Sequence, residues 1–237
     1  SVNNGQPKRR RWVRRLVRFL SVVLGVLGAL FACAYPEIGR APSGDHLDRL
    51  SKSPNYDVKA KRFVNRRQDL YDKARQGLTM SEFLKAAWFG KQKRSPDRKL
   101  PETKVDLDAF LASKDLAYIW LGHSTILLRM DGKTILMDPN FHNAAPVSFM
   151  VKRFQPPVLR LDELPPIDLV LISHDHYDHL SRRSIQFLSE QKTKFIVPLG
   201  LSSYLEGWGI TADRITELDW WQEVEWDGLK IVCTPSQ

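Results

Sequence analysis

The stretch IDLVLISHDHYDHLS, residues 167–181, constrains the fold of this chain more than any other. Its apolar start does not alternate with polar residues, which predicts a strand that is buried on both faces of a sheet. A polar cluster follows at once, made of His174, His176, Asp178 and His179. The loop at the carboxyl end of a buried strand is where α/β proteins place binding and catalytic groups. The sequence therefore predicts a rigid sheet with a cluster of ligands at one edge.

The spacing of these four side chains suits metal binding. Residues i and i+2 of an extended segment point the same way, so His174 and His176 can share one ion. Asp178 and His179 lie on the following turn and can reach a second ion. Imidazole and carboxylate ligands without thiolate fit Zn²⁺, iron or Mn²⁺. A solvated polar loop is the alternative interpretation, and it fits three histidines at this spacing poorly.

Strand and helix signals surround the motif in a definite order. Strands are predicted at residues 116–122, 125–130 and 133–139, with a hairpin turn at Asp131-Gly132. After the motif we expect a helix at 181–191, a strand at 194–198, a short helix at 201–210, a strand at 214–219 and a hairpin at 222–235. Antiparallel strands followed by β-α-β alternation predict an α+β fold of packed sheets with helices outside.

The excess of positive charge lies far from the motif. The chain carries 36 Lys and Arg residues against 27 Asp and Glu, a net charge of +9. Residues 1–36 and 37–106 each hold a net +7, whereas residues 107–237 hold −5. A nucleic-acid enzyme needs its basic surface near the site, so no nucleic-acid partner is expected. The two cysteines, Cys33 and Cys233, do not make a disulfide framework.

A membrane segment is predicted near the N-terminus. A basic head at residues 8–15 precedes an apolar run at residues 16–35, in which Arg18 lies near the edge and can snorkel. The run of about twenty residues is long enough to cross a bilayer. The basic head predicts a cytoplasmic N-terminus, and hence a cell-membrane protein whose catalytic domain lies on the outer, periplasmic side. A cleaved secretory signal, a lipoprotein signal at residues 30–33 and a buried core helix are the alternatives.

These features divide the chain into three parts. Residues 1–35 are expected to form the basic head and the membrane anchor or signal, residues 36–104 a linker and N-terminal extension, and residues 105–237 the domain that carries the site. Pro, Gly and Ser are frequent at residues 36–54, which predicts a linker that leaves the membrane. Residues 80–90 have helical spacing and predict a helix.

At the His-x-His-x-Asp-His motif the chain resembles the metallo-β-lactamase superfamily. The likeness covers about residues 100–237, and it includes WLGHSTILLRMDGKTILMDPNF at 120–141, VPLGL at 197–201, ELDWWQE at 217–223 and TPSQ at 234–237. These segments resemble the branch that contains N-acylphosphatidylethanolamine-hydrolysing phospholipase D, and more distantly the ascorbate-6-phosphate lactonases. The resemblance implies an αββα sandwich and a metal centre, and it is weakly specific for substrate.

The resemblance also implies a role for each matching residue. His174 and His176 would bind the first metal, and Asp178 and His179 the second. Asp178 is in addition the expected catalytic residue. Asp138, which precedes Pro139 at the end of an early strand, would support the loop that carries the ligands.

Other residues near the site have expected roles as well. His123 matches a Gly-His-Ser/Ala element near the pocket, and a structural hydrogen bond is an equal alternative. Trp220 and Trp221 match an Asp-Trp-Trp element and are expected to pack. Asp175 is expected to orient a ligand or to cap a helix, and Tyr177 either packs or contacts substrate.

Members of this family complete their site with ligands that this sequence does not include. A third histidine follows the Thr-Pro-Ser/Ala-Gln element, and a bridging aspartate and a last histidine come later. Because the sequence stops at Gln237, the resemblance implies the N-terminal half of the sandwich. We expect a fragment of a longer chain, with a natural truncation as the alternative.

The intact protein is therefore expected to be a zinc-dependent hydrolase with two Zn²⁺ ions, or alternatively with iron or manganese. A phospholipid-like phosphodiester is the favoured substrate, attacked by a metal-bound hydroxide. A lactonase or other ester hydrolase is the alternative enzyme, and an inactive fragment is the alternative for the 237 residues given. The expected partners are a small-molecule or lipid substrate and a membrane, contacted through residues 16–35.

Overall fold

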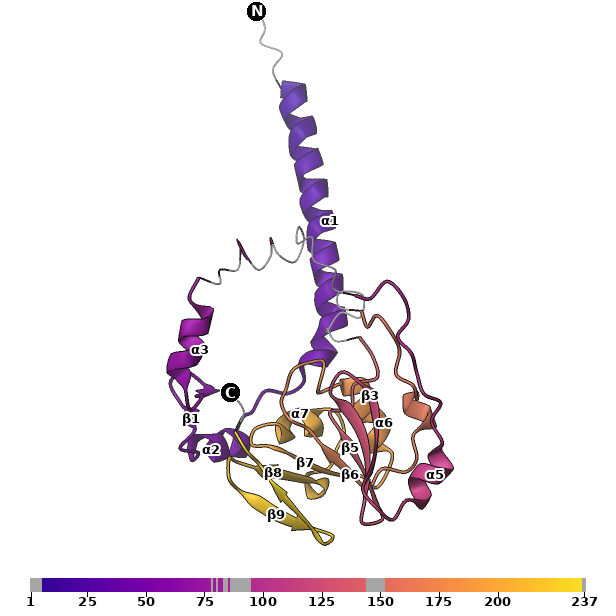
Figure 1. Ribbon diagram of the computed structural model, residues 1–237. Helices are drawn as coiled ribbons and strands as arrows, with labels where there is room; N and C mark the ends of the chain where they lie inside the picture. The colour runs from indigo at the N-terminus through magenta and orange to yellow at the C-terminus, as the bar shows by residue number, and fades with distance from the viewer. Residues whose placement is uncertain are drawn as a thin grey trace, which may run out of the picture.

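The computed structural model of this chain describes residues 6–77, 79, 81–82, 85, 95–143 and 152–235. Within this part, a mixed sheet forms the centre of the domain, and one long helix projects from it (Figure 1). The helix expected at residues 80–90 falls mostly outside the described residues, so it stays a prediction.

The central sheet has six strands in the order β3-β4-β5-β6-β7-β8. They are β3 (Ala117–Gly122), β4 (Thr125–Met130), β5 (Lys133–Met137), β6 (Leu169–Leu171), β7 (Lys194–Pro198) and β8 (Ile215–Leu218). The first three are antiparallel, and β5 to β8 run parallel. The carboxyl ends of β5 and β6 therefore meet at one edge, with Met137 paired to Leu171. The predicted strands are confirmed, although β6 is shorter than the predicted 167–173.

Helices cover one face of this sheet, as the α+β prediction requires. They are α5 (Leu107–Ala112), α6 (Arg182–Ser189) and α7 (Ser202–Gly207), with short 3₁₀ turns at η1 (Leu161–Glu163) and η2 (Ala212–Arg214). The core beneath them includes Leu127, Val170, Ile185, Leu188, Phe195 and Leu205, all fully buried. Each such side chain stabilises the fold by about 1.5–3 kcal/mol relative to an exposed one. This core holds the strands that carry the polar loops.

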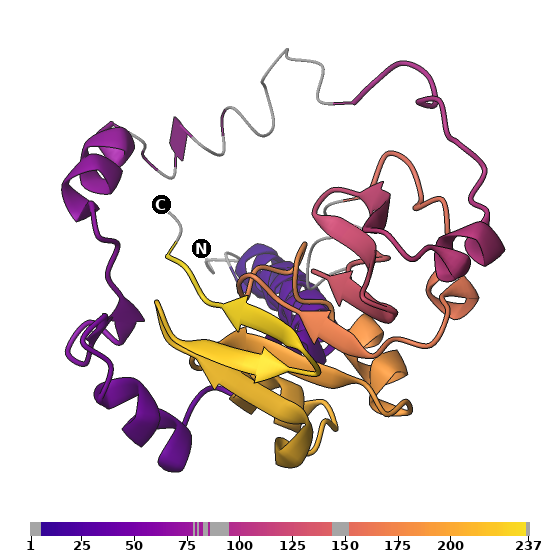
Figure 2. The same cartoon turned by 60° about the horizontal axis from the view of Figure 1, so that its bottom comes forward.

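A hairpin begins a second layer on the opposite face. It consists of β9 (Glu223–Trp226) and β10 (Leu229–Val232), and it lies across the central sheet in Figure 2. Its side chain Leu229 packs with Leu169 of β6 in a second core. Since Val170 belongs to the first core, β6 is buried on both faces, as predicted. The hairpin turns at Asp131-Gly132 and Asp227-Gly228 are confirmed, and all four residues have the positive φ that such turns need.

Helix α1 (Gln6–Ile38) stands away from the domain, and only its last turns reach it (Figure 1). The part from Arg11 to Ile38 is long and apolar enough to cross a membrane, and its most apolar window is wholly unburied. A secretory signal would show the same length and composition. The helix is thus a candidate for a span or a signal.

The N-terminal extension is fastened to the domain rather than separated from it. It contains α2 (Asp45–Ser51), β1 (Tyr56–Asp57), β2 (Arg62–Phe63) and α3 (Gln68–Arg75). Nε of Arg49 donates to Glu217 at 3.2 Å, and the hydroxyl of Ser53 donates to buried Asp219 at 2.6 Å. Residues 36–54 were expected to be a linker because of their Pro, Gly and Ser content. That composition indicates turns, but it gives no information about which distant residues the segment contacts.

Candidate metal centre

The histidine loop, residues 173–179, begins where β6 ends. A tight turn shapes it, because the backbone N–H groups of His179 and Leu180 both donate to the carbonyl of His176, at 2.9 and 2.8 Å. The turn brings the ring of His179 to 3.9 Å from the ring of His174, measured between centroids. The rings of His174 and His176 lie 4.5 Å apart. The loop therefore gathers its three imidazoles on one side.

A buried carboxylate fixes this loop to the sheet. Asp138 follows β5, is 6% exposed, and has its own N–H bonded to the carbonyl of Leu171 at 2.9 Å. It accepts the backbone N–H of Ser173 at 2.7 Å and the Ser173 hydroxyl at 2.8 Å. Nδ1 of His179 lies 2.8 Å from the same carboxylate. Because Nδ1 is engaged in this way, Nε2 of His179 is left free to face the cluster.

His123 enters the same cluster from the turn between β3 and β4. Its φ of 51° is unusual for a residue other than glycine, and it follows Gly122, whose φ is 97°. The indole N–H of Trp120 donates to the carbonyl of His123 at 2.8 Å and helps to hold this turn. Nε2 of His123 lies 2.8 Å from Oδ2 of Asp178. The side chain of His123 therefore lies within the cluster, in close contact with Asp178.

Three residues could donate to one metal ion. Ligand atoms of His123, Asp178 and His179 all lie within 4.8 Å of one another. Imidazole and carboxylate are the donors that Zn²⁺, Fe²⁺ and Mn²⁺ accept, so the side chains fit such an ion. His174 lies alongside, and burial, together with the nearby His179 and His176, lowers the pKa of its ring. A lowered pKa favours the neutral imidazole, which is the form that binds metal.

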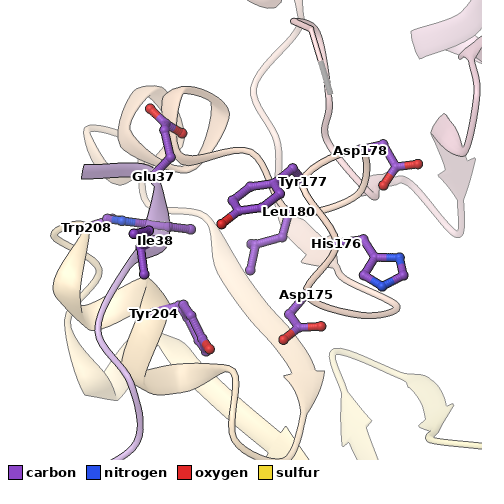
Figure 3. A pocket seen from close by; sticks show the side chains of 9 residues that line it. All are labelled: Glu37, Ile38, Asp175, His176, Tyr177, Asp178, Leu180, Tyr204 and Trp208. Carbon is purple, nitrogen blue, oxygen red and sulfur yellow. The ribbon is translucent and has the colours of Figure 1, made fainter. Parts of the chain in front are cut away.

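A pocket of about 410 Å³ opens beside the histidine loop (Figure 3). It is lined by Glu37, Ile38, Asp175, His176, Tyr177, Asp178, Leu180, Tyr204 and Trp208. The loop forms one side, and Glu37 and Ile38 from the end of α1 face it from the other. Tyr177 extends from the loop into this space. Asp175 also lines it and does not cap α6, whose N-cap is Ser181.

A larger, mainly apolar groove of about 1070 Å³ runs along the edge strand β3, and His123 and Asp178 are among the residues that line it. Its walls include Tyr118, Trp120 and Phe154, which are 70%, 60% and 55% exposed. Exposed aromatic side chains of this number next to a polar cluster are typical of a binding groove rather than of ordinary surface.

Some site residues are not evident from the sequence. Ser173 bridges Asp138 and the histidines, and its only signal is its place between the strand and the first histidine. The wall residues Glu37 and Tyr204 belong to segments with no motif. By contrast, Trp220 packs as expected, with its ring 6.3 Å from that of Phe63. The expectation is wrong for Trp221, whose side chain is 60% exposed, with the guanidinium of Arg66 over its ring.

Comparisons with known proteins find relatives of the domain that carries this site. A family model described as "Beta-lactamase superfamily domain" matches residues 133–237. An uncharacterized protein of Mycobacterium tuberculosis is 45% identical over 125 residues, which cover 52% of this chain and 34% of the relative. The N-acyl-phosphatidylethanolamine-hydrolyzing phospholipase D 1 of Caenorhabditis elegans is 33% identical over 156 residues, or 61% of this chain and 44% of the relative.

An archaeal relative extends the comparison beyond these two. A UPF0173 metal-dependent hydrolase of Saccharolobus solfataricus is 29% identical over 117 residues, or 48% of this chain and 47% of the relative. The chain thus spans less than half the length of each of these relatives. The resemblance to the metallo-β-lactamase superfamily, including the N-acylphosphatidylethanolamine-hydrolysing phospholipases D, is therefore confirmed for the part of the chain that these matches cover.

Proposed function

We propose that this protein is a membrane-anchored, metal-dependent hydrolase that cleaves a phosphodiester in a phospholipid-like substrate. The observation that carries the proposal is the cluster of His123, Asp178 and His179, with ligand atoms within 4.8 Å of one another. The buried carboxylate of Asp138 orients His179 in that cluster. The name of the nematode relative, a phospholipase D, supports the class of substrate.

We propose Zn²⁺ as the metal, with two ions in the intact protein. His174 and His176 would contribute to one ion, and Asp178 and His179 to the other. Zn²⁺, iron or manganese at such a site supplies positive charge and acidifies water. Asp138 keeps the proton on Nδ1 of His179. We propose Asp178, whose Oδ2 lies 2.8 Å from Nε2 of His123, as the catalytic residue, because its carboxylate could accept a proton near the substrate.

The apolar groove along β3 supports an amphiphilic substrate. Its lining includes the aromatic side chains Tyr118 and Trp120 as well as His123 and Asp178. A hydrocarbon chain in this groove would remove apolar surface from water, at about 25 cal/mol for each Å². A lipid bound in this way would have its polar end at the cluster. A small water-soluble ester would use the cluster without using the groove.

Helix α1 supports anchoring in the cell membrane, with the domain on the outer, periplasmic side. Basic residues precede the apolar run, and Lys and Arg favour the cytoplasmic side. We further propose that β9 and β10 begin the second sheet of an αββα sandwich, because they pack on the face of the central sheet opposite the helices.

The test uses the full-length protein purified in detergent from its membranes. Metal content is measured by mass spectrometry, and hydrolysis is measured on a phosphodiester lipid, a carboxylic ester lipid and a lactone. We expect bound Zn²⁺ and preferential cleavage of the phosphodiester. His176→Ala should lower that activity at least a hundredfold and reduce the metal content.

A matched control uses a histidine outside the site. His46 contacts Ser202 and Glu206, so His46→Ala should retain the metal and most of the activity. The proposal is refuted if His176→Ala keeps full activity and full metal content. Preferential cleavage of the ester or the lactone would refute the phosphodiesterase and favour the other hydrolases of this fold.

A further inference from the structure

The junction, residues 36–40, joins the end of α1 to the domain through specific contacts. The indole N–H of Trp208 donates to the carbonyl of Pro36 at 3.2 Å. A guanidinium nitrogen of Arg182 lies 3.4 Å from the carboxylate of Glu37. The two contacts come from different elements, α6 and the end of α7. They therefore fix both the position and the direction of the last turn.

Close backbone packing reinforces these contacts. Gly39 has a φ of 71°, and a Cβ built on it would overlap the ring of Tyr204 and lie 3.1 Å from a ring carbon of Trp208. Only glycine fits this position without a shift of the domain or the helix. On the other side, a Cβ at Gly207 would lie 2.9 Å from Cβ of Arg40. The junction thus runs flush against α7.

The same turn is part of the pocket that contains the histidine loop. Glu37 and Ile38 line the pocket together with His176 and Asp178 (Figure 3). The apolar run ends at residue 35, and each helical residue adds 1.5 Å, so Ile38 lies about 5 Å beyond that end. If α1 spans the bilayer, the pocket lies at the membrane surface.

We propose that the junction is a positioning element, which makes the last turn of α1 a wall of the substrate pocket and holds the opening of that pocket at the membrane surface. The inference rests on the proposed function, and it adds a role for a segment outside the metal centre. A flexible linker of the same length would let the domain rotate away from the bilayer. A fixed junction keeps the pocket beside a substrate that is confined to the membrane, and so raises its effective concentration.

The first test changes the junction and leaves the metal centre untouched. Gly39→Ala should push the last turn away from Tyr204 and Trp208. Its matched control is Gly28→Ala, within α1, where a Cβ meets nothing within 4 Å. Rates are measured on a long-chain phosphodiester lipid in vesicles and on a short-chain analogue in solution. We expect the ratio of vesicle rate to solution rate to fall at least fivefold for Gly39→Ala and to stay unchanged for Gly28→Ala.

The second test needs no activity, so it stands if Gly39→Ala fails to fold. Ile38→Cys and Tyr204→Cys are combined in a protein that carries Cys33→Ser and Cys233→Ser, and a short thiol-specific cross-linker is applied in native membranes. We expect efficient cross-linking for this pair. With Tyr35→Cys in place of Ile38→Cys, we expect at least fivefold less, because Tyr35 is 64% exposed and is not among the pocket residues.

The outcomes separate the junction from the proposed function. Equal cross-linking of the two pairs, or a wild-type rate ratio in a folded Gly39→Ala protein, would overturn the role of the junction. A wild-type protein that cleaves neither the lipid nor its analogue would refute the phosphodiesterase. In that case the cross-linking result alone decides whether α1 forms the pocket wall.

Discussion

The histidine loop and the junction approach the same pocket from opposite sides, and they are held in different ways. The loop is held by hydrogen bonds to Asp138, which is 6% exposed and continues directly from the sheet. The junction is held at the surface, where the Glu37 and Arg182 side chains are 24% and 29% exposed. Removing a hydrogen-bond partner from a buried charged group lowers the free energy of unfolding strongly, whereas breaking an exposed ion pair lowers it little. The histidine loop is therefore held by buried polar contacts, whereas the junction is held by close packing at Gly39 together with a weaker, partly exposed ion pair.

Removing Asp138 should produce the largest effect. Asp138→Ala leaves the N–H of Ser173 and Nδ1 of His179 without their acceptor. We expect metal affinity to fall about 10–100-fold, because residues that orient ligands commonly matter to this extent. The free energy of unfolding should fall by about 1–3 kcal/mol. Chelator competition and urea unfolding measure the two quantities.

A control at the other end of the same strands sharpens this result. The carboxylate of Asp168 accepts the backbone N–H of Thr134 at 2.8 Å, at the amino end of β6. Asp168→Ala should lower stability in a similar way and leave metal affinity unchanged. Equal loss of metal in both variants would show that general stability, and not the orientation of the loop, controls the site.

Removing one hydroxyl from the loop should have a smaller effect. Ser173→Ala loses the bond to Asp138 at 2.8 Å and the contact with Nδ1 of His174 at 2.9 Å. The backbone N–H of Ser173 still donates to Asp138, so metal affinity should fall by about tenfold or less. Ser189→Ala, on α6, is the control and should bind metal normally. A loss as large as that of Asp138→Ala would contradict this ranking.

The stability of the pocket wall at α7 should depend on pH, because Glu217 titrates differently in the folded and unfolded states. Burial by itself would raise the pKa of this carboxyl, but hydrogen bonds from Ser202, Gly200 and Arg49 lower it below its ordinary value. A lowered folded-state pKa gives stability above the unfolded pKa of about 4.3, and that stability is lost as the pH falls through the folded-state value. Glu217→Gln should therefore be about 1–3 kcal/mol less stable than wild type at pH 7.

The difference between wild type and Glu217→Gln should shrink below about pH 4.3. Urea unfolding at several pH values measures it, with Glu225→Gln on the exposed side of β9 as the control. A difference that stays constant down to the lowest pH at which both proteins are folded would contradict the assigned cause.

The ion pair between Glu37 and Arg182 at the junction should contribute least to stability. A double-mutant cycle with Glu37→Gln and Arg182→Gln should give a coupling energy of about 0.2–1 kcal/mol, as for partly exposed pairs. The coupling should weaken in about 1 M salt, where the Debye length is near 3 Å. A coupling energy above that range and independent of salt would show that polar contacts hold the junction as strongly as they hold the histidine loop.

The sequence predicts those parts of the molecule whose signals are local. The hairpins at Asp131-Gly132 and Asp227-Gly228 depend on turn residues next to their strands, and both are confirmed. The fully apolar strand β6 and the cluster that follows it are also adjacent in the chain. The assignment of each ligand to a metal stays a prediction, because it depends on the bound ions.

Parts that depend on distant partners could not be predicted. The role of Ser173 requires the parallel pairing of β5 with β6, which places Asp138 beside it. The junction requires Trp208 to meet Pro36, and neither segment carries a motif. Pro, Gly and Ser content predicts where a chain turns, and it leaves open whether the turning chain packs against something.

The parallel pairing of β5 and β6 also sets the order in which the site can assemble during folding. The antiparallel strands β3 to β5 are joined by tight turns, whereas the connection from β5 to β6 runs from Asp138 to Asp168. Closing such a loop costs chain entropy before any contact repays it, so parallel pairs form late. The acceptor for His179 lies on one side of that connection and the histidine on the other. In a refolding experiment, high-affinity metal uptake should therefore follow the slow phase in which β5 and β6 pair.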